Sequence, residues 1–432
     1  MQDCFPRMMQ VRQRFSKSPP LDIRAVIEQG FRSQGIGERV KQGSRIAVAV
    51  GSRGIRNLDK IVSCLLELLQ AAGSKPFIVP AMGSHGGATP EGQTELLATF
   101  GITEQKLGVP VKASMEVKSL GRTEDGVETW FSTEALGADG IIVVNRVKPH
   151  TDFEASIGSG ILKMISIGLG KHAGAATCHA RSARLGHERV IRTVSQLIIH
   201  SLHSAHSAPI LCGVAILEDA VHETAQIEFL KPEEMESREE QLHARAKALM
   251  PKLPFDQIDL LIVDRIGKNI SGTGMDPNII GRHVQGYSAS LAGGGQGRPH
   301  ISRIFVRELT PETRGNAIGI GLADLTTTRM VQAMDKPTTY INVLTALTPQ
   351  NAKIPIHFDT DREAISQGLV SLALPEGVEP KVVRIADTLS LEHLAVSEAY
   401  ADLLGKEEKL QAQGDWEAMK FDSSGNLPPL LV

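Results

Sequence analysis

The sequence predicts an α/β protein with two domains, each built on a largely parallel sheet that helices flank. Its 432 residues are many for one domain and comfortable for two. Short, uninterrupted apolar runs such as 46–50 and 141–144 are typical of parallel strands that are buried on both faces. Segments with apolar residues at helical spacing alternate with these runs, which favours the α/β class.

The first strand–helix unit begins with a strand at 46–50. A turn that contains Ser52 and Arg53 leads to a helix, for which Asn57 is the expected N-cap. Open α/β sheets bind ligands at turns that follow the carboxyl ends of parallel strands. A guanidinium there can grip a carboxylate or a phosphate, so Arg53 is a candidate anion ligand; a surface arginine in a solvated turn is the alternative.

Two histidines are expected at the same edge of this sheet. His85 follows the short strand 77–79, ahead of a helix whose expected N-cap is Thr89. His150 follows the next long apolar run of the chain. Each histidine taken alone is equally a loop residue. Because parallel strands end at one edge, we nevertheless expect Arg53, His85 and His150 to lie near one another.

The stretch from Val147 to His179 carries the most informative pattern. Glycines on either side of Ser159 allow close backbone approach, and the following ILKMISIGLG predicts a short apolar helix with Lys163 in its first turn. The helix dipole and partial burial both disfavour a protonated amine there, and a neutral lysine is a nucleophile that can attach to a cofactor or substrate. The alternative is a lysine that caps or solvates a helix. A histidine at a strand end, a glycine turn, the lysine and then His179 in a Gly/Ala-rich loop favour the functional interpretation.

This arrangement resembles the nickel-pincer lactate racemase family, which comprises 2-hydroxyacid racemases and epimerases. The resemblance is carried by Pro149-His150, Ser159-Gly160-Ile161-Leu162-Lys163 and His179. It implies that Lys163 holds the nickel-pincer nucleotide (pyridinium-3-thioamide-5-thiocarboxylic acid mononucleotide) and that His179 ligates its nickel. It also implies that His85 and His150 are the two acid/base residues.

Three further positions enter through the same resemblance. Ser52 and Arg53 fit the last two positions of the family's Asp-x-Thr-Arg turn, although Val50 stands where the family has aspartate. Ser52 and Arg53 are therefore implied to bind the cofactor, and Arg53 is also a candidate for the substrate carboxylate. Lys268 is implied to contact the substrate from the C-terminal domain; a surface lysine is the alternative.

Two long segments follow the lysine and histidine pattern. Residues 181–205 are predicted to form one helix, and the charged run 231–254 an exposed helix. His200, His203 and His206 recur along the first of them. No acid or cysteine stands near them at ligand spacing, so we interpret them as a polar helix end and not as a zinc site.

Prolines near residue 255 predict a domain break. Residues 1–255 are expected to form the N-terminal, cofactor-anchoring domain, and residues 256–432 a C-terminal domain that closes the cleft with the active site between them. The C-terminal domain starts with a strand and the turn that contains Lys268. Later in this domain, residues 338–344 read as strand-like because of their β-branched and aromatic content.

The composition excludes several classes of partner. A net charge of −3 and an aromatic content of 4% argue against nucleic acid and anionic membranes. No apolar run approaches the length of a membrane span, and the first residues lack the apolar core of a signal peptide. The 4 scattered cysteines without a CxxC pair suggest a reducing compartment. A cytoplasmic protein that acts on a small molecule is therefore expected.

The leading hypothesis is a nickel-pincer-dependent racemase or epimerase of a 2-hydroxy acid. Hydride transfer from the α-carbon to the cofactor is expected, with two histidines as acid and base and with cofactor-biosynthesis enzymes as loading partners. Two alternatives stay open. One is an α/β enzyme that uses a phosphate-bearing cofactor or substrate without nickel, bound at the glycine turns 51–54 and 158–160. The other is a non-catalytic carrier of the nickel cofactor.

Overall fold

The structure is a computed structural model that describes residues 5–51, 54–151, 153–204, 208–282 and 299–430. By its internal contacts the chain divides into two compact units. The N-terminal unit consists of Lys17–His150 and Glu154–Met250, and the C-terminal unit of Met1–Ser16, Thr151–Phe153 and Pro251–Val432. The residues up to Ser16, which the sequence analysis assigns to the N-terminal domain, are thus grouped with the C-terminal unit.

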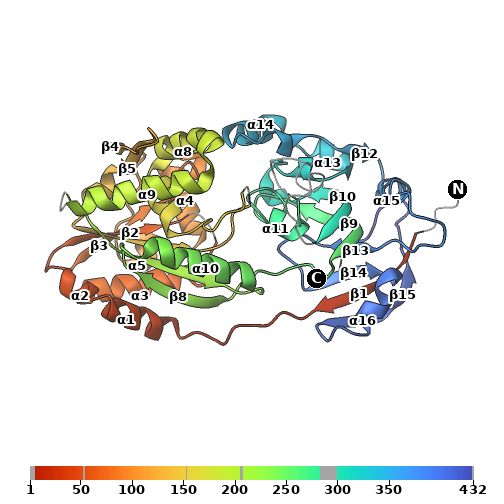
Figure 1. Ribbon diagram of the computed structural model, residues 1–432, viewed down its shortest axis with the longest axis horizontal. Helices are drawn as coiled ribbons and strands as arrows, with labels where there is room; N and C mark the ends of the chain where they lie inside the picture. Colours follow the sequence, from red (N-terminus) through yellow and green to blue (C-terminus); the bar gives the residue numbers. More distant parts are fainter. Residues whose placement is uncertain (1–4, 52–53, 152, 205–207, 283–298, 431–432) are drawn as a thin grey trace. The chain divides into compact units, whose positions relative to one another are not determined.

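A five-stranded sheet forms the core layer of the N-terminal unit (Figure 1). Its strands lie in the order β3 (Lys75–Pro80), β2 (Arg45–Val50), β6 (Gly140–Arg146), β7 (Ile210–Glu218) and β8 (Thr224–Leu230). All neighbouring pairs are parallel except β7 and β8. The strands β3, β2 and β6 therefore end at one edge of the sheet, as predicted.

Helices cover both faces of this sheet. One face packs against α1 (Ile23–Ser33), α2 (Ile36–Arg39) and α3 (Leu58–Ala71). The other contacts α7 (Ile161–Lys163), the π-helix η2 (Met164–Gly168), α9 (His187–Ser204) and α10 (Met235–Leu249). The remaining elements of the unit are η1 (Gly86–Ala88), α4 (Pro90–Thr99), α5 (Glu104–Leu107), α6 (Thr133–Leu136), α8 (Lys171–Leu185) and the antiparallel pair of β4 (Val117–Arg122) and β5 (Glu128–Ser132).

Both predicted N-cap residues stand at the start of their helices, but only one of the two side chains caps its helix. Thr89 is the N-cap of α4, and its hydroxyl accepts a hydrogen bond from the amide of Gly92 at 3.1 Å. Asn57 is the N-cap of α3, with a φ of 60°. Its side chain does not cap the helix and donates instead to Thr224 Oγ1 at 3.0 Å. Asn57 therefore ties the turn after β2 to β8.

Two predictions about the helices of this unit are wrong. Residues 181–205 do not form one helix, because Gly186 ends α8 with a φ of 84° and α9 begins at the next residue. The charged run 231–254 is not an exposed helix, because α10 buries one face, which includes Glu239 and His243. The many charged residues on its outer face obscured the apolar positions of the inner face in the sequence.

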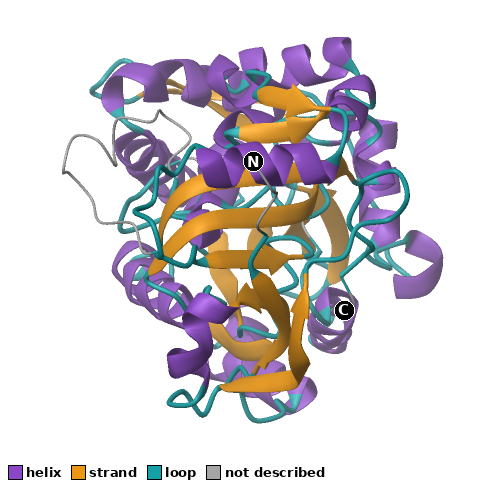
Figure 2. Ribbon diagram, turned by 90° about the vertical axis from the view of Figure 1, so that its right-hand side faces the viewer, coloured by secondary structure: helices purple, strands orange, loops and turns teal. Residues whose placement is uncertain are grey.

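An eight-stranded sheet forms the C-terminal unit, and Figure 2 shows its twisted strands. The order is β12 (Ile356–Phe358), β11 (Leu325–Thr327), β10 (His300–Leu309), β9 (Gln257–Ile266), β13 (Val382–Ile385), β14 (His393–Ser397), β1 (Arg7–Gln13) and β15 (Leu410–Ala418). The pairs from β12 to β13 are parallel, as expected. The pairs from β13 to β15 are antiparallel, with β1 between β14 and β15.

Short helices connect these strands. They are α11 (Pro277–Ile280), η3 (Pro311–Thr313), η4 (Ile320–Leu322), α13 (Thr328–Gln332), α14 (Lys336–Thr345), η5 (Pro349–Ala352), α15 (Asp361–Val370), η6 (Glu398–Tyr400) and α16 (Ala401–Leu404). The strand predicted at 338–344 is wrong, because these residues lie in α14. Asp335 caps this helix by accepting from the amide of Thr338 at 2.7 Å, and Pro337 stands in its first turn. Throughout the described parts of both units, no helix has the length and apolar character that a membrane span requires.

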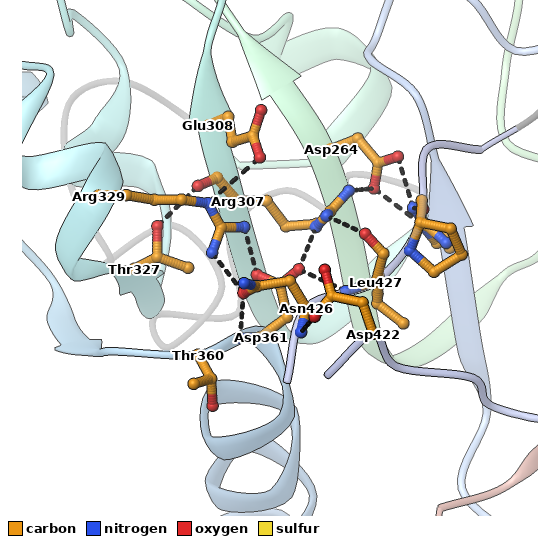
Figure 3. Close-up of polar contacts among 12 residues, drawn as sticks. Asp264, Arg307, Glu308, Thr327, Arg329, Thr360, Asp361, Asp422, Asn426 and Leu427 are labelled. Atoms are coloured by element: carbon orange, nitrogen blue, oxygen red, sulfur yellow. Dashed lines mark hydrogen bonds and ion pairs between the residues drawn. The ribbon is translucent and has the colours of Figure 1, made fainter. Parts of the chain in front are cut away.

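A buried network of ion pairs holds the end of the chain against the C-terminal sheet (Figure 3). Arg307 of β10 lies 3.0 Å from a carboxylate oxygen of Asp264 on β9 and 2.8 Å from one of Asp361 on α15. Arg384 of β13 donates two hydrogen bonds of 2.8 Å to the same Asp264. The carbonyl of Leu427 accepts from Arg307 at 2.7 Å, and its amide donates to Asp361 at 2.9 Å. Removing Asp264 would leave the buried guanidinium of Arg384 without a counter-charge.

Asp264→Ala is expected to destabilise the C-terminal unit by about 3–5 kcal/mol, because it leaves the buried Arg384 without a counter-charge and Arg307 with Asp361 alone. Glu308→Ala is the matched control, since the carboxylate of Glu308 pairs with Arg329 at 3.2 Å with a side chain that is 46% exposed, and such pairs are worth less than about 1 kcal/mol. Urea unfolding followed by the fluorescence of Trp416, with Trp130→Phe in every variant, reports on the C-terminal unit alone. Equal midpoints for the two alanine variants would contradict the prediction.

Candidate active site

A backbone bridge brings His150 next to Lys163. Lys148 and Ser159 form an isolated antiparallel bridge whose two N–H···O hydrogen bonds measure 2.8 and 2.9 Å. The bridge closes the loop that follows β6, so the start of α7 lies beside the end of that strand. As a result, the Nζ atom of Lys163 lies 2.5 Å from Nε2 of His150.

Lys163 stands where α7 changes into the π-helix η2. The short apolar helix predicted here is confirmed, and the structure adds the π-turn. All residues of η2 are buried, and the carbonyl of Gly168 at its end accepts from the amide of Gly83 at 3.1 Å. The lysine is half-buried and directly precedes this buried segment. Single π-turns of this kind occur often at functional sites.

Two more imidazoles lie near this lysine. His179 lies on α8 and not in a loop as predicted, while His187 is the first residue of α9. The ring centroid of His187 is 6.1 Å from that of His179 and 6.5 Å from that of His150. His187 was missed at the sequence level; the one available signal was its place directly after a helix-ending glycine.

Burial sets the charge of these imidazoles. The pKa of His179 is lowered to about 4, mainly by burial and further by the charges of Lys163 and His187. The pKa of His187 is likewise lowered to about 4, mainly by burial and further by the charge of Lys163. Both rings are therefore neutral near pH 7, which is the form of histidine that binds metal ions.

His85 lies in the turn after β3, as predicted. The side-chain amide of Gln93 on α4 donates to the carbonyls of Gly83 and His85, at 2.9 and 3.3 Å. The bond between Gly83 and Gly168 connects this turn to the segment that carries Lys163. The His85 turn thus has a fixed backbone next to η2.

A fully buried lysine links this turn to the helix of His179. Lys171, the first residue of α8, has a φ of 53° and no exposed surface. Its amine donates to the carbonyl of Pro80 at 2.5 Å and to Oε1 of Gln93 at 3.3 Å. Burial lowers the pKa of Lys171 to about 8, against the opposing charge of Glu134. The sequence analysis did not single out Lys171 or Gln93.

The remaining candidates have other placements. Ser52 and Arg53 lie outside the described residues. Arg56, from the same turn, is ion-paired with Glu223 at 3.0 Å. Lys268 belongs to the C-terminal unit, in the loop after β9, where its amine donates to Oδ1 of Asn342 at 2.7 Å.

The described residues hold no group of three or more histidine, cysteine, aspartate or glutamate side chains arranged to bind a metal ion by themselves. His200 and His203 lie on α9, and His206 lies outside the described residues.

The fold and this cluster define an α/β protein in which a lysine and three histidines gather in the segments that follow β6 of a parallel sheet. Residues 9–189, which contain the whole cluster, match the family model described as the lactate racemase N-terminal domain. Over these residues the chain is similar to the lactate racemase N-terminal domain.

Other comparisons are more distant. No curated protein sequence matches the chain. Among solved structures, the lactate racemase apoprotein from Thermoanaerobacterium thermosaccharolyticum is similar, with 13% sequence identity and a TM-score of 0.49. The match covers 88% of this chain and 93% of that one. The similarity to the lactate racemase N-terminal domain rests on the sequence match over residues 9–189 and not on this superposition.

The stability of the protein is expected to rise with pH between about 8 and 10.5 because of Lys171, whose pKa falls from the ordinary lysine value of 10.5 to about 8 in the folded protein. In this window the unfolded chain binds a proton that the folded chain lacks, so this residue adds up to ~1.4 kcal/mol per pH unit. In Lys171→Met this part of the slope should vanish, whereas Lys60→Met, at an exposed site on α3, should keep it. Denaturant unfolding at several pH values gives the free energy of unfolding of each variant as a function of pH. The same pH dependence in wild type and Lys171→Met would contradict the role of Lys171.

Proposed function

We propose that this protein is a nickel-pincer-dependent racemase or epimerase of a 2-hydroxy acid. The observation that carries the proposal is the contact of 2.5 Å between the amine of Lys163 and Nε2 of His150, in a segment that matches the lactate racemase N-terminal domain. Lys163 is the residue for covalent attachment of the nickel-pincer nucleotide, and cofactor-biosynthesis enzymes are the partners that load it.

The donor set fits this group. An amine at the end of a rigid turn is suited to covalent attachment, and His179 supplies a neutral nitrogen ligand, as its pKa of about 4 supports. Imidazole nitrogen is a suitable ligand for nickel. When bound, the cofactor supplies an acceptor for the hydride of the substrate's α-carbon.

The histidines perform the proton transfers. One imidazole, in its neutral form, accepts the proton of the substrate hydroxyl, and the other, in its protonated form, donates a proton to the oxygen of the opposite enantiomer. Inversion at the α-carbon needs such a group for each enantiomer, which is the role of His150 at the end of β6 and His85 at the end of β3. A cation, Arg53 or Lys268, holds the substrate carboxylate through charge-assisted hydrogen bonds.

Lys163→Ala is expected to abolish both covalent loading and racemisation, because no other residue of the cluster offers an amine at this position. The measurement is the intact mass of protein that was co-expressed with the cofactor-biosynthesis enzymes and nickel, followed by chiral chromatography of 2-hydroxy acids. Lys60→Ala, at an exposed lysine of α3, is the control. Covalent loading without turnover of any hydroxy acid would indicate a carrier, and no adduct in the wild type would argue against the cofactor.

His85→Asn and His150→Asn are each expected to lower kcat by about 10²–10⁴-fold, the range typical for the loss of a general acid or base. The mass adduct on Lys163 should remain in both variants, because neither histidine is needed for attachment. His200→Asn, on the exposed end of α9, should leave kcat unchanged. An unaltered kcat in both active-site variants would exclude the acid/base roles.

A further inference from the structure

A fully buried carboxylate on α10 contacts the turn that carries Lys163. Glu239 has no exposed surface, and its Oε2 atom accepts a hydrogen bond of 2.9 Å from the amide of Leu162. The residue before α7, Gly160, offers no side chain to cap this helix. Glu239 therefore supplies the cap from a helix that lies far away in the sequence.

The glycine turn is shaped to admit this carboxylate. A Cβ atom on Gly160 would lie 2.2 Å from Oε1 of Glu239, and one on Gly158 would lie 3.0 Å from Nε2 of His243, one turn further along α10. The side-chain amide of Asn145, on β6, donates to the carbonyl of Gly160 at 3.1 Å. The backbone just before Lys163 is thus held from two sides, by β6 and by α10.

The helix that carries Glu239 is itself anchored. Arg192 of α9 forms ion pairs with Glu236 and Glu240, which flank Glu239 on α10, and with Glu188 at 2.6 Å. The buried Met235 and Leu242 lie on the inner face of α10 with Glu239. The position of the carboxylate is therefore fixed by α9 and by the core.

The chemistry of Glu239 is unusual for a purely structural residue. Within the described part of the chain, its Oε1 atom has no hydrogen-bond partner. Burial raises the pKa of Glu239 to about 7, against the amide hydrogen bonds of Leu162 and Ile161 and the charge of Arg192. A half-satisfied buried carboxylate opposes stability, and an apolar residue of the same size would be the cheaper choice for packing.

We propose that Glu239 is a positioning residue that fixes the first turn of α7 and thereby holds the amine of Lys163 against His150. The catalytic consequence rests on the proposed function, whereas the positioning itself does not. Glu239 acts through the backbone of Leu162 and does not touch the reacting groups. Its loss should loosen the turn and release the amine while leaving the sheet intact.

The test compares Glu239→Ala and Glu239→Gln with Glu233→Gln, which removes the same charge at an exposed position just before α10. Two rates are measured on the protein without cofactor. The first is the hydrogen exchange of the Leu162 amide, and the second is the acylation of Lys163 by a small amine-reactive reagent, relative to the exposed Lys60 in the same digest.

In Glu239→Ala the Leu162 amide should exchange about fivefold faster or more, as for the loss of a helix cap. The acylation of Lys163 should rise by a similar factor, which a merely structural loss elsewhere would not produce. Glu239→Gln keeps an oxygen acceptor and should lie between alanine and wild type, and it carries the test if the alanine variant does not fold. Rates for both Glu239 variants equal to those of Glu233→Gln would overturn the proposal.

Cofactor loading separates this inference from the proposed function. If both rates change as expected while the wild type never acquires a mass adduct, the positioning role stands and the nickel-pincer function fails. If the wild type loads and the Glu239 variants load equally well with unchanged rates, the positioning role fails and the function stands.

Discussion

The backbone bridge between Lys148 and Ser159 is the constraint on which the candidate active site depends. His150 and Lys163 are 13 residues apart in the chain, and an open loop of that length would leave their side chains in many relative positions. Two backbone hydrogen bonds remove most of that freedom. The bridge works because β6 holds one side of it, while α7 and η2 hold the other against the same sheet.

Around this bridge, buried polar groups fix backbone positions more than they add stability. Gln93 and Lys171 tie the turn of His85 to the first residue of α8. Glu239 and Asn145 hold the turn before Lys163. Buried polar groups of this kind specify one arrangement because any displacement leaves a donor or acceptor unpaired in a medium of low dielectric constant. The two sets of contacts meet at η2, so the candidate acid/base and anchoring residues belong to one rigid assembly within the N-terminal unit.

Much of this arrangement is predictable from the sequence. The apolar runs of β2 and β6 and the turn after β3 place His85 and His150 at one edge of a parallel sheet, and the glycine turn followed by an apolar segment places Lys163. These features depend on local periodicity and on the rule that parallel strands end together. The order of the sheet, β3-β2-β6, agrees with that reasoning.

The features that could not be predicted depend on tertiary contacts. The role of Glu239 can be recognised only once α10 is known to pack on the sheet. The charged outer face of α10 suggests instead that the helix is exposed to solvent. His187 enters the cluster because Gly186 breaks a helix that periodicity alone would continue. In α14, a cap by Asp335 outweighs a β-branched composition. In each case a single capping or breaking residue decides against the average preference of the segment.

The place of β1 between β14 and β15 has a consequence for biosynthesis. This strand precedes the N-terminal unit in the chain, whereas both of its partners follow that unit. It must therefore stay unpaired while the N-terminal unit is synthesised, and the C-terminal sheet closes only when β14 and β15 have emerged. A fragment that starts after residue 16 would expose two strand edges, at β14 and β15, that invite pairing with other chains. No single cut of the gene therefore separates the residues of the two units.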